Sequence, residues 1–174
     1  MTRTRFVGVV FAVCLTWQPG ADRGALAEAP AGNGVVTLGK IPMVTVRPGE
    51  STTVVIPIEI AEGYHVQANP ASDEFLIPLE LELQLEETDK LVSWKPVYPA
   101  PGTFRLEGTA EDLLTYHGSI GVAVSIYPSP QVRPGERLFT GLLNYQACDR
   151  RRCLFPTSVP VTFKVVISEN DTND

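Results

Sequence analysis

The sequence predicts an all-β fold, an immunoglobulin-like antiparallel β-sandwich that forms a single domain. Short segments of alternating apolar and polar residues recur along the chain, and most are bounded by proline or glycine. The length of 174 residues and the hydrophobic content of 44% suffice for one core. Fifteen prolines and fourteen glycines leave little room for the helices that a parallel sheet would need between its strands.

The clearest predicted strand is residues 79–85, where four leucines face one way and three polar residues face the other. Pro57 interrupts another strong strand, which predicts that this strand lies at a sheet edge or contains a bulge. Residues 111–115 have room for one helical turn and no more. The other predicted strands are residues 52–60, 64–68, 91–97, 119–126, 137–145 and 158–167.

The first 27 residues have the pattern of an export signal. Arg3 and Arg5 precede an apolar run at residues 6–17, and Ala-Leu-Ala at residues 25–27 offers small side chains for cleavage. The run is shorter than the roughly 20 residues that span a bilayer, although a retained membrane anchor stays an alternative. Cys14 lies inside the run, but the Phe-Ala-Val before it argues against a lipid-modified cysteine.

Beyond the predicted signal, the chain divides into three parts. We expect residues 28–40 to be a flexible lead-in, residues 41–167 to form the sandwich and residues 168–174 to be a polar tail. Removal of the signal takes away three arginines and one aspartate, which leaves 11 basic and 19 acidic residues, a net charge of −8. This charge argues against nucleic acid as a partner, and no later stretch is apolar and long enough to insert into a membrane.

Cys148 and Cys153, the two cysteines outside the signal, are the strongest candidate site. They lie in the loop between two predicted strands, close enough to form a disulfide. Closing so small a ring stabilises a fold by only about 2 kcal/mol, against roughly 5 kcal/mol for a ring of about 100 residues. Arg150, Arg151 and Arg152 lie between the cysteines, where they would lower a thiol pKa and attract an acidic partner. From these residues alone, a redox-active disulfide and a structural disulfide beside a solvated charge run are equally supported.

The cysteine segment also resembles a known family. Residues 145–156, Tyr-Gln-Ala-Cys-Asp-Arg-Arg-Arg-Cys-Leu-Phe-Pro, are followed by an alternating strand, as in the amino-terminal periplasmic domain of DsbD thiol:disulfide interchange proteins. The resemblance extends over residues 40–167, because further segments follow in the order that such domains show. It implies an immunoglobulin-like periplasmic domain without a cofactor, whose Cys148 and Cys153 cycle between dithiol and disulfide. The further segments are residues 63–70, 76–81, 98–99 and 116–118.

The resemblance implies partners as well. In the family, this domain takes electrons from a membrane-embedded partner and passes them to periplasmic thioredoxin-like proteins, including disulfide isomerases and cytochrome c maturation factors. Carried over, Cys153 forms the mixed disulfide and Cys148 resolves it. The sequence ends just after the domain, so we expect the electron donor to be a separate protein. The spacing of four residues between the cysteines is one shorter than in the best-known members, and the loop is more basic.

Members of the family shield the disulfide with a cap loop that carries an aromatic residue. Residues 73–75, Asp-Glu-Phe, resemble a cap triplet but precede the strand at 79–85, which is too early in the chain order. Residues 98–105, with Phe104, are better placed. Tyr145, three residues before Cys148, is a further candidate to screen the sulfur atoms. The sequence leaves the choice of cap open.

Two other function classes stay as alternatives. The first is an adaptor or structural sandwich in which the disulfide only holds a loop. The second is a metal-handling domain, copper included, that uses His65 and His117; their spacing lacks the close cysteine or histidine pairs of a zinc motif, so we expect no metal. Glu80 and Glu82 share a strand face and are expected to be solvated rather than to form an acid–base pair.

Overall fold

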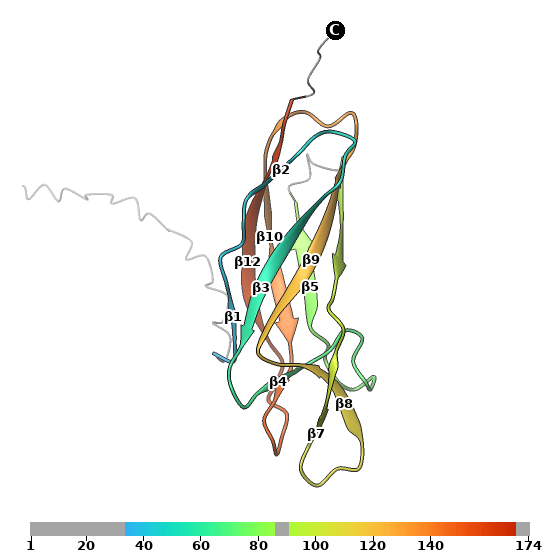
Figure 1. The fold of residues 1–174 in the computed structure, drawn as a ribbon, viewed down its shortest axis with the longest axis vertical. Helices are drawn as coiled ribbons and strands as arrows, with labels where there is room; N and C mark the ends of the chain where they lie inside the picture. Colours follow the sequence, from blue (N-terminus) through green and yellow to red (C-terminus); the bar gives the residue numbers. More distant parts are fainter. Residues whose placement is uncertain (1–33, 86–90, 170–174) are drawn as a thin grey trace, which may run out of the picture.

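The structure is a computed structural model that describes residues 34–85 and 91–169, shown as a ribbon in Figure 1. Within these ranges the chain forms strands and no helix. The predicted export signal and most of the predicted tail lie outside the described residues. The strands are β1 (Val36–Leu38), β2 (Val44–Val46), β3 (Thr52–Ile60), β4 (His65–Gln67), β5 (Glu80–Gln84), β6 (Val92–Val97), β7 (Gly102–Arg105), β8 (Asp112–Tyr116), β9 (Ser119–Pro128), β10 (Gly135–Tyr145), β11 (Ala147–Cys148) and β12 (Thr157–Ile167).

The strands pair into three four-stranded sheets. The first has the order β1-β3-β9-β6, the second β2-β12-β10-β5 and the third β11-β4-β8-β7. All described pairings are antiparallel except that of β12 with β2. The first two sheets form the sandwich, and the third lies at the end opposite the carboxy-terminal end of β12 (Figure 1). The predicted all-β, immunoglobulin-like fold is confirmed.

The core lies between the first two sheets, because alternate residues of their long strands are buried. Val54, Ile56 and Ile58 of β3 are inaccessible to solvent, and Phe139 of β10 stacks on Phe163 of β12 with ring centroids 4.8 Å apart. Burying such side chains stabilises the fold by about 1.5–3 kcal/mol each. The alternation predicted for residues 79–85 is confirmed in β5, whose residues are alternately exposed and buried.

Pro57 does not mark an edge strand or a bulge, so that expectation is wrong. β3 lies between β1 and β9, and its register with β9 continues through the pair Pro57–Gly121. The Pro57 carbonyl accepts a hydrogen bond from the N–H of Gly39, 2.9 Å away. In an antiparallel strand the nitrogen of Pro57 faces the same side as its carbonyl, towards Gly39. This position lies beyond the end of β1 at Leu38, where the sheet needs no N–H donor from Pro57.

The sequence expectations differ from the structure at two further segments. Residues 112–116 form strand β8 rather than a helical turn, because they pair with both β4 and β7. Residues 36–38, expected in the flexible lead-in, form β1, where Val36 is buried against the core. Within the described residues, no helix is long and apolar enough to cross a membrane.

Candidate redox site

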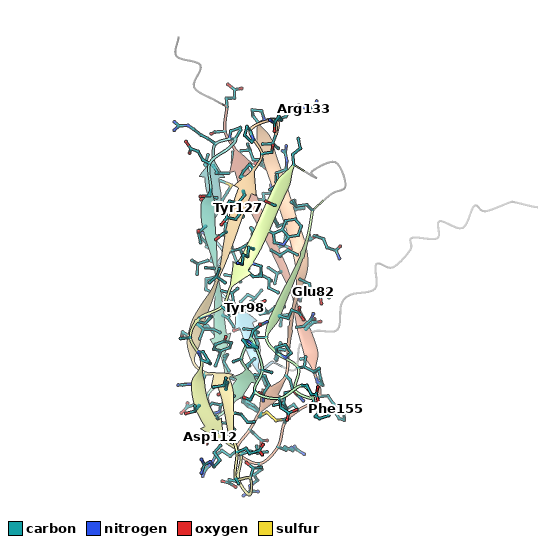
Figure 2. All side chains as sticks on the ribbon, turned by 90° about the vertical axis from the view of Figure 1, so that its right-hand side faces the viewer. Glu82, Tyr98, Asp112, Tyr127, Arg133 and Phe155 are labelled. Carbon is teal, nitrogen blue, oxygen red and sulfur yellow. A yellow bond between two sulfur atoms is a disulfide. The ribbon has the colours of Figure 1, made fainter. Side chains whose placement is uncertain are left out.

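Cys148 and Cys153 are joined by a disulfide at the end of the sandwich that carries the third sheet. Figure 2 shows it as a yellow bond near the same end as Phe155 and Asp112. The two sulfur-bearing residues differ in exposure: Cys148 is inaccessible to solvent, whereas Cys153 is partly exposed. Cys153 is therefore the more accessible of the two cysteines.

Asp149 folds the loop between the cysteines. Its Oδ1 accepts hydrogen bonds from the backbone N–H groups of Arg151 at 2.8 Å and Arg152 at 2.9 Å, and its own N–H donates to the Arg152 carbonyl at 2.9 Å. Aspartate commonly initiates such turns. These two backbone donors hold the pKa of Asp149 below its ordinary value. The turn directs the three arginines outward, with side chains between 78% and 85% exposed.

A hairpin formed by β7, β8 and the loop between them, residues 102–116, lies against this loop, and we call it the cap hairpin. The N–H of Glu107 donates to the Arg150 carbonyl at 2.8 Å. The Glu107 carboxylate also forms ion pairs with Arg150 at 3.1 Å and Arg151 at 3.6 Å. Glu107 was not predicted from the sequence as a site residue, because its partners follow more than 40 positions later.

Phe104 links β7 of the cap hairpin, at the edge of the third sheet, to β4 of the same sheet. Its ring stacks on that of His65, with centroids 3.9 Å apart and planes inclined by 18°. His65 is the register partner of Cys148 across β4 and β11, so Phe104 covers the residue next to the disulfide. The ring of His117 lies 5.5 Å from that of His65. Burial, and to a lesser extent the neighbouring His117, lowers the pKa of His65.

Gln67 places its side-chain amide under the disulfide. Its Nε2 lies 3.1 Å from Sγ of Cys148 and 4.0 Å from Sγ of Cys153, and the side chain is fully buried. Gln67 lies in residues 63–70, one of the segments that resemble the family, but no pattern in the sequence indicates a role for it. Alternation along a strand indicates only which residues face the core, and here β4 is covered on both faces.

An open groove of about 670 Å³ runs along the exposed side of Cys153. Phe155, at its border, is 92% exposed and lies at the lower right of Figure 2. The groove combines apolar side chains with one cation, and its lining residues are Gln146, Arg152, Cys153, Leu154, Phe155, Pro156 and Thr157.

The remaining sequence candidates lie as follows. Tyr145 is fully buried at the end of β10; burial raises the pKa of its hydroxyl, and a hydrogen bond to the backbone of Val36 opposes that rise. Tyr145 is thus tied to β1. Phe75, in the alternative cap triplet, is 83% exposed, and its N–H donates to the Asp73 carboxylate, which makes a local turn. Among the described residues, no group of three or more His, Cys, Asp or Glu side chains is arranged to hold a metal ion.

Residues 35–164 match the protein family described as "Thiol:disulfide interchange protein DsbD, N-terminal". The chain belongs to this family. The DsbD N-terminal match covers nearly the whole described fold, including both cysteines, Gln67 and the cap hairpin. No curated protein matches the chain significantly.

Solved structures similar to the chain include two with related names. The amino-terminal periplasmic domain of ScsB from Proteus mirabilis is 12% identical, with a TM-score of 0.44 over 73% of this chain and 43% of that chain. The chain thus spans less than half of that structure's length. The reduced DsbD amino-terminal domain of Neisseria meningitidis is 16% identical, with a TM-score of 0.39 over 70% and 86%.

A cellulosome domain is also similar to the chain. The seventh ScaB type I cohesin of Pseudobacteroides cellulosolvens is 7% identical, with a TM-score of 0.49 over 80% of this chain and 96% of that chain. Because structural similarity at this level spans domains with unrelated names, the DsbD N-terminal assignment rests on the family match alone.

Proposed function

We propose that this domain is a periplasmic thiol–disulfide exchange module. Its Cys148–Cys153 disulfide accepts reducing equivalents from a separate membrane-embedded thiol protein and passes them to thioredoxin-like proteins. The observation that carries the proposal is the unequal exposure of the two cysteines, with Cys148 buried and Cys153 beside an open groove. A redox disulfide needs one accessible sulfur for attack, whereas a purely structural one does not.

The exchange follows from this asymmetry. A thiolate of the electron donor attacks Sγ of Cys153, a new S–S bond forms to the donor, and the Cys148–Cys153 bond breaks with Cys148 leaving as a thiolate. The donor's second thiol then attacks the mixed disulfide and releases Cys153. The donor loses two electrons and two protons and becomes a disulfide, while Cys148 and Cys153 become thiols. Delivery to an acceptor disulfide runs in the opposite sense, beginning with the Cys153 thiolate.

The groove beside Cys153 supplies the surface on which a partner lies during exchange. Leu154, Phe155 and Pro156 give it an apolar strip, and an exposed aromatic side chain such as Phe155 is a common binding anchor. Arg152 adds a cation on the same border, which favours the thiolate of Cys153 and an acidic partner surface.

The cap hairpin covers the other side of the site. Stacking of Phe104 on His65, and ion pairs of Glu107 with residues 149–152 (the arginine loop), hold the hairpin against the segment that contains the cysteines. We assign the shielding role to this hairpin with Phe104 and not to residues 73–75, because Phe75 is largely exposed. The base of the hairpin is fixed, because β8 pairs with β4 and its Thr115 and Tyr116 are buried, whereas residues 107–111 at the tip are exposed. Local opening is therefore expected at the tip, where the contacts lie on the surface.

Trapping of a mixed disulfide tests the proposal. A thioredoxin-like protein that lacks its resolving cysteine, and whose remaining cysteine has been converted to a mixed disulfide with thionitrobenzoate, is incubated with Cys148→Ser and, as the matched control, Cys153→Ser; attack by the free thiol forms the complex and releases thionitrobenzoate. We expect a covalent complex through Cys153 in the first variant and little complex in the second, whose remaining cysteine is buried. If neither folded variant forms a complex, the disulfide is structural and the adaptor alternative is favoured.

A further inference from the structure

We infer that Gln67 is a third residue of the redox site, whose side-chain amide stabilises the Cys148 thiolate released when the disulfide is reduced. This inference rests on the proposed exchange function and adds a residue to it. No cysteine pattern reveals such a residue, since Gln67 precedes Cys148 by 81 positions.

The position of Gln67 is fixed by its backbone. Its N–H donates to the Gln146 carbonyl at 3.0 Å, and its carbonyl accepts the N–H of Leu79, also at 3.0 Å. Because both main-chain groups are hydrogen-bonded, the backbone of Gln67 is fixed, and this directs its side-chain amide towards Cys148. The hydrogen bond from Nε2 to Sγ of Cys148, 3.1 Å long, is fully buried.

In the oxidised site, the hydrogen-bonding groups of the Gln67 amide are poorly satisfied. A disulfide sulfur is a weak acceptor, and Oε1 of Gln67 has no hydrogen-bond partner among the described residues. Buried polar atoms are nearly always paired, and an unpaired one disfavours the state that contains it. Reduction changes the partner: a Cys148 thiolate is a strong acceptor for the Nε2 hydrogen, and a Cys148 thiol can donate to Oε1. The amide therefore favours the reduced form.

Gln67 also acts during the exchange step. When a donor thiolate attacks Cys153, the electron pair of the broken S–S bond goes to Sγ of Cys148, which is inaccessible to solvent. Water cannot stabilise that charge, and the guanidinium groups of the arginine loop are directed outward. The N–H of Gln67 already lies on the sulfur that becomes charged, so little rearrangement is needed at the moment of reaction.

The test compares wild type with Gln67→Met, which keeps the length and burial of the side chain but removes the N–H. Oxidised protein is reduced with dithiothreitol, and both the rate constant and the equilibrium constant are measured. We expect reduction of Gln67→Met to be roughly tenfold to hundredfold slower, as for loss of a hydrogen bond to a charged group. The equilibrium constant should fall by about tenfold, which is a potential lower by about 30 mV.

Thr115→Val is the matched control. Thr115 is the register partner of Gln67 on β8, is equally buried, and its hydroxyl also lacks a partner within the described residues. Within the described residues, the hydrogen bonds to the two sulfur atoms come from Gln67 and not from Thr115. Because Thr115 lies in the cap hairpin, the control is read in the equilibrium constant of reduction, which Thr115→Val should leave at the wild-type value.

Three results separate the possible failures. Wild type that resists dithiothreitol even with the domain folded overturns the exchange function itself. Wild type and Gln67→Met with equal rates and equal equilibrium constants overturn the role of Gln67 alone. If Gln67→Met fails to fold, Gln67→Asn, which withdraws the amide by one methylene, is measured in its place. In the Cys153→Ser background, Gln67→Asn should also raise the Cys148 pKa read from thiolate absorbance, and an unchanged pKa contradicts the inference.

Discussion

Replacing Glu107 with glutamine is expected to loosen the tip of the cap hairpin from the arginine loop and to speed reduction of the disulfide. The substitution removes two ion pairs, to Arg150 at 3.1 Å and to Arg151 at 3.6 Å. It leaves the backbone hydrogen bond between Glu107 and Arg150 and the stacking of Phe104 on His65 in place. The change therefore tests the ion pairs alone.

The size of the effect follows from the exposure of the charges. The Glu107 side chain is 50% exposed and the two arginines are 80% and 85% exposed, so solvent screens both pairs. Exposed pairs contribute about 0.5 kcal/mol each, and loss of about 1 kcal/mol raises the population of the open hairpin about fivefold. If reduction proceeds through the open state, its rate at low ionic strength should rise by the same factor.

The assay is the rate of reduction by dithiothreitol, followed by alkylation of the new thiols. Glu111→Gln is the matched control, because Glu111 is exposed on the same hairpin, carries the same charge and forms no ion pair within the described ranges. Raising the salt concentration should bring Glu107→Gln and wild type together, since salt screens surface charges. Equal rates for Glu107→Gln and Glu111→Gln at low salt would refute the reasoning.

Three further predictions address the cap, the loop and the core. Phe104→Ala removes a ring pair worth about 1 kcal/mol together with part of an apolar side chain, so reduction should be about tenfold faster and, unlike that of Glu107→Gln, insensitive to salt. No acceleration would mean that the hairpin does not shield the site. Asp149→Ala removes two backbone hydrogen bonds, so its melting temperature should lie below that of wild type at neutral pH. Because the folded pKa of Asp149 is lowered, this stabilisation is present above the unfolded pKa of about 4 and is lost as pH falls through the folded pKa. A difference in melting temperature that persists in strong acid would contradict it. Phe139→Ala should cost about 3–5 kcal/mol in urea unfolding yet leave the reduction rate of the folded protein unchanged, and a changed rate would show that the core and the site are coupled.

The long strands are predictable because each presents several alternating residues to one core. Leu81 and Leu83 are buried while Glu80, Glu82 and Gln84 are exposed, as the pattern requires. Strands β1, β2, β7 and β11 have only two to four residues, too few for a period to show. These strands pair with segments that are distant in sequence, such as Ile58–Ile60 for β1. The pattern of residues within a short strand does not identify such a partner.

The pair of cysteines was evident from the sequence, but its surroundings were not. Cysteines close together in a loop can be recognised by type and spacing alone, whereas Gln67 becomes important only through contact. Val66, Gln67 and Ala68 are all buried, so β4 departs from the alternation that would have placed Gln67 in solvent. A polar residue inside a predicted strand was the only signal, and it does not distinguish a site residue from a solvated one.

The reduction potential of the Cys148–Cys153 couple tests the central claim most directly. The oxidised domain is equilibrated with a series of glutathione and dithiothreitol buffers, and the fraction of free thiols gives the potential. Thiol–disulfide exchange predicts a value above about −300 mV, in the range of thioredoxin-like proteins. A value below about −300 mV would show a structural disulfide and contradict the proposed function.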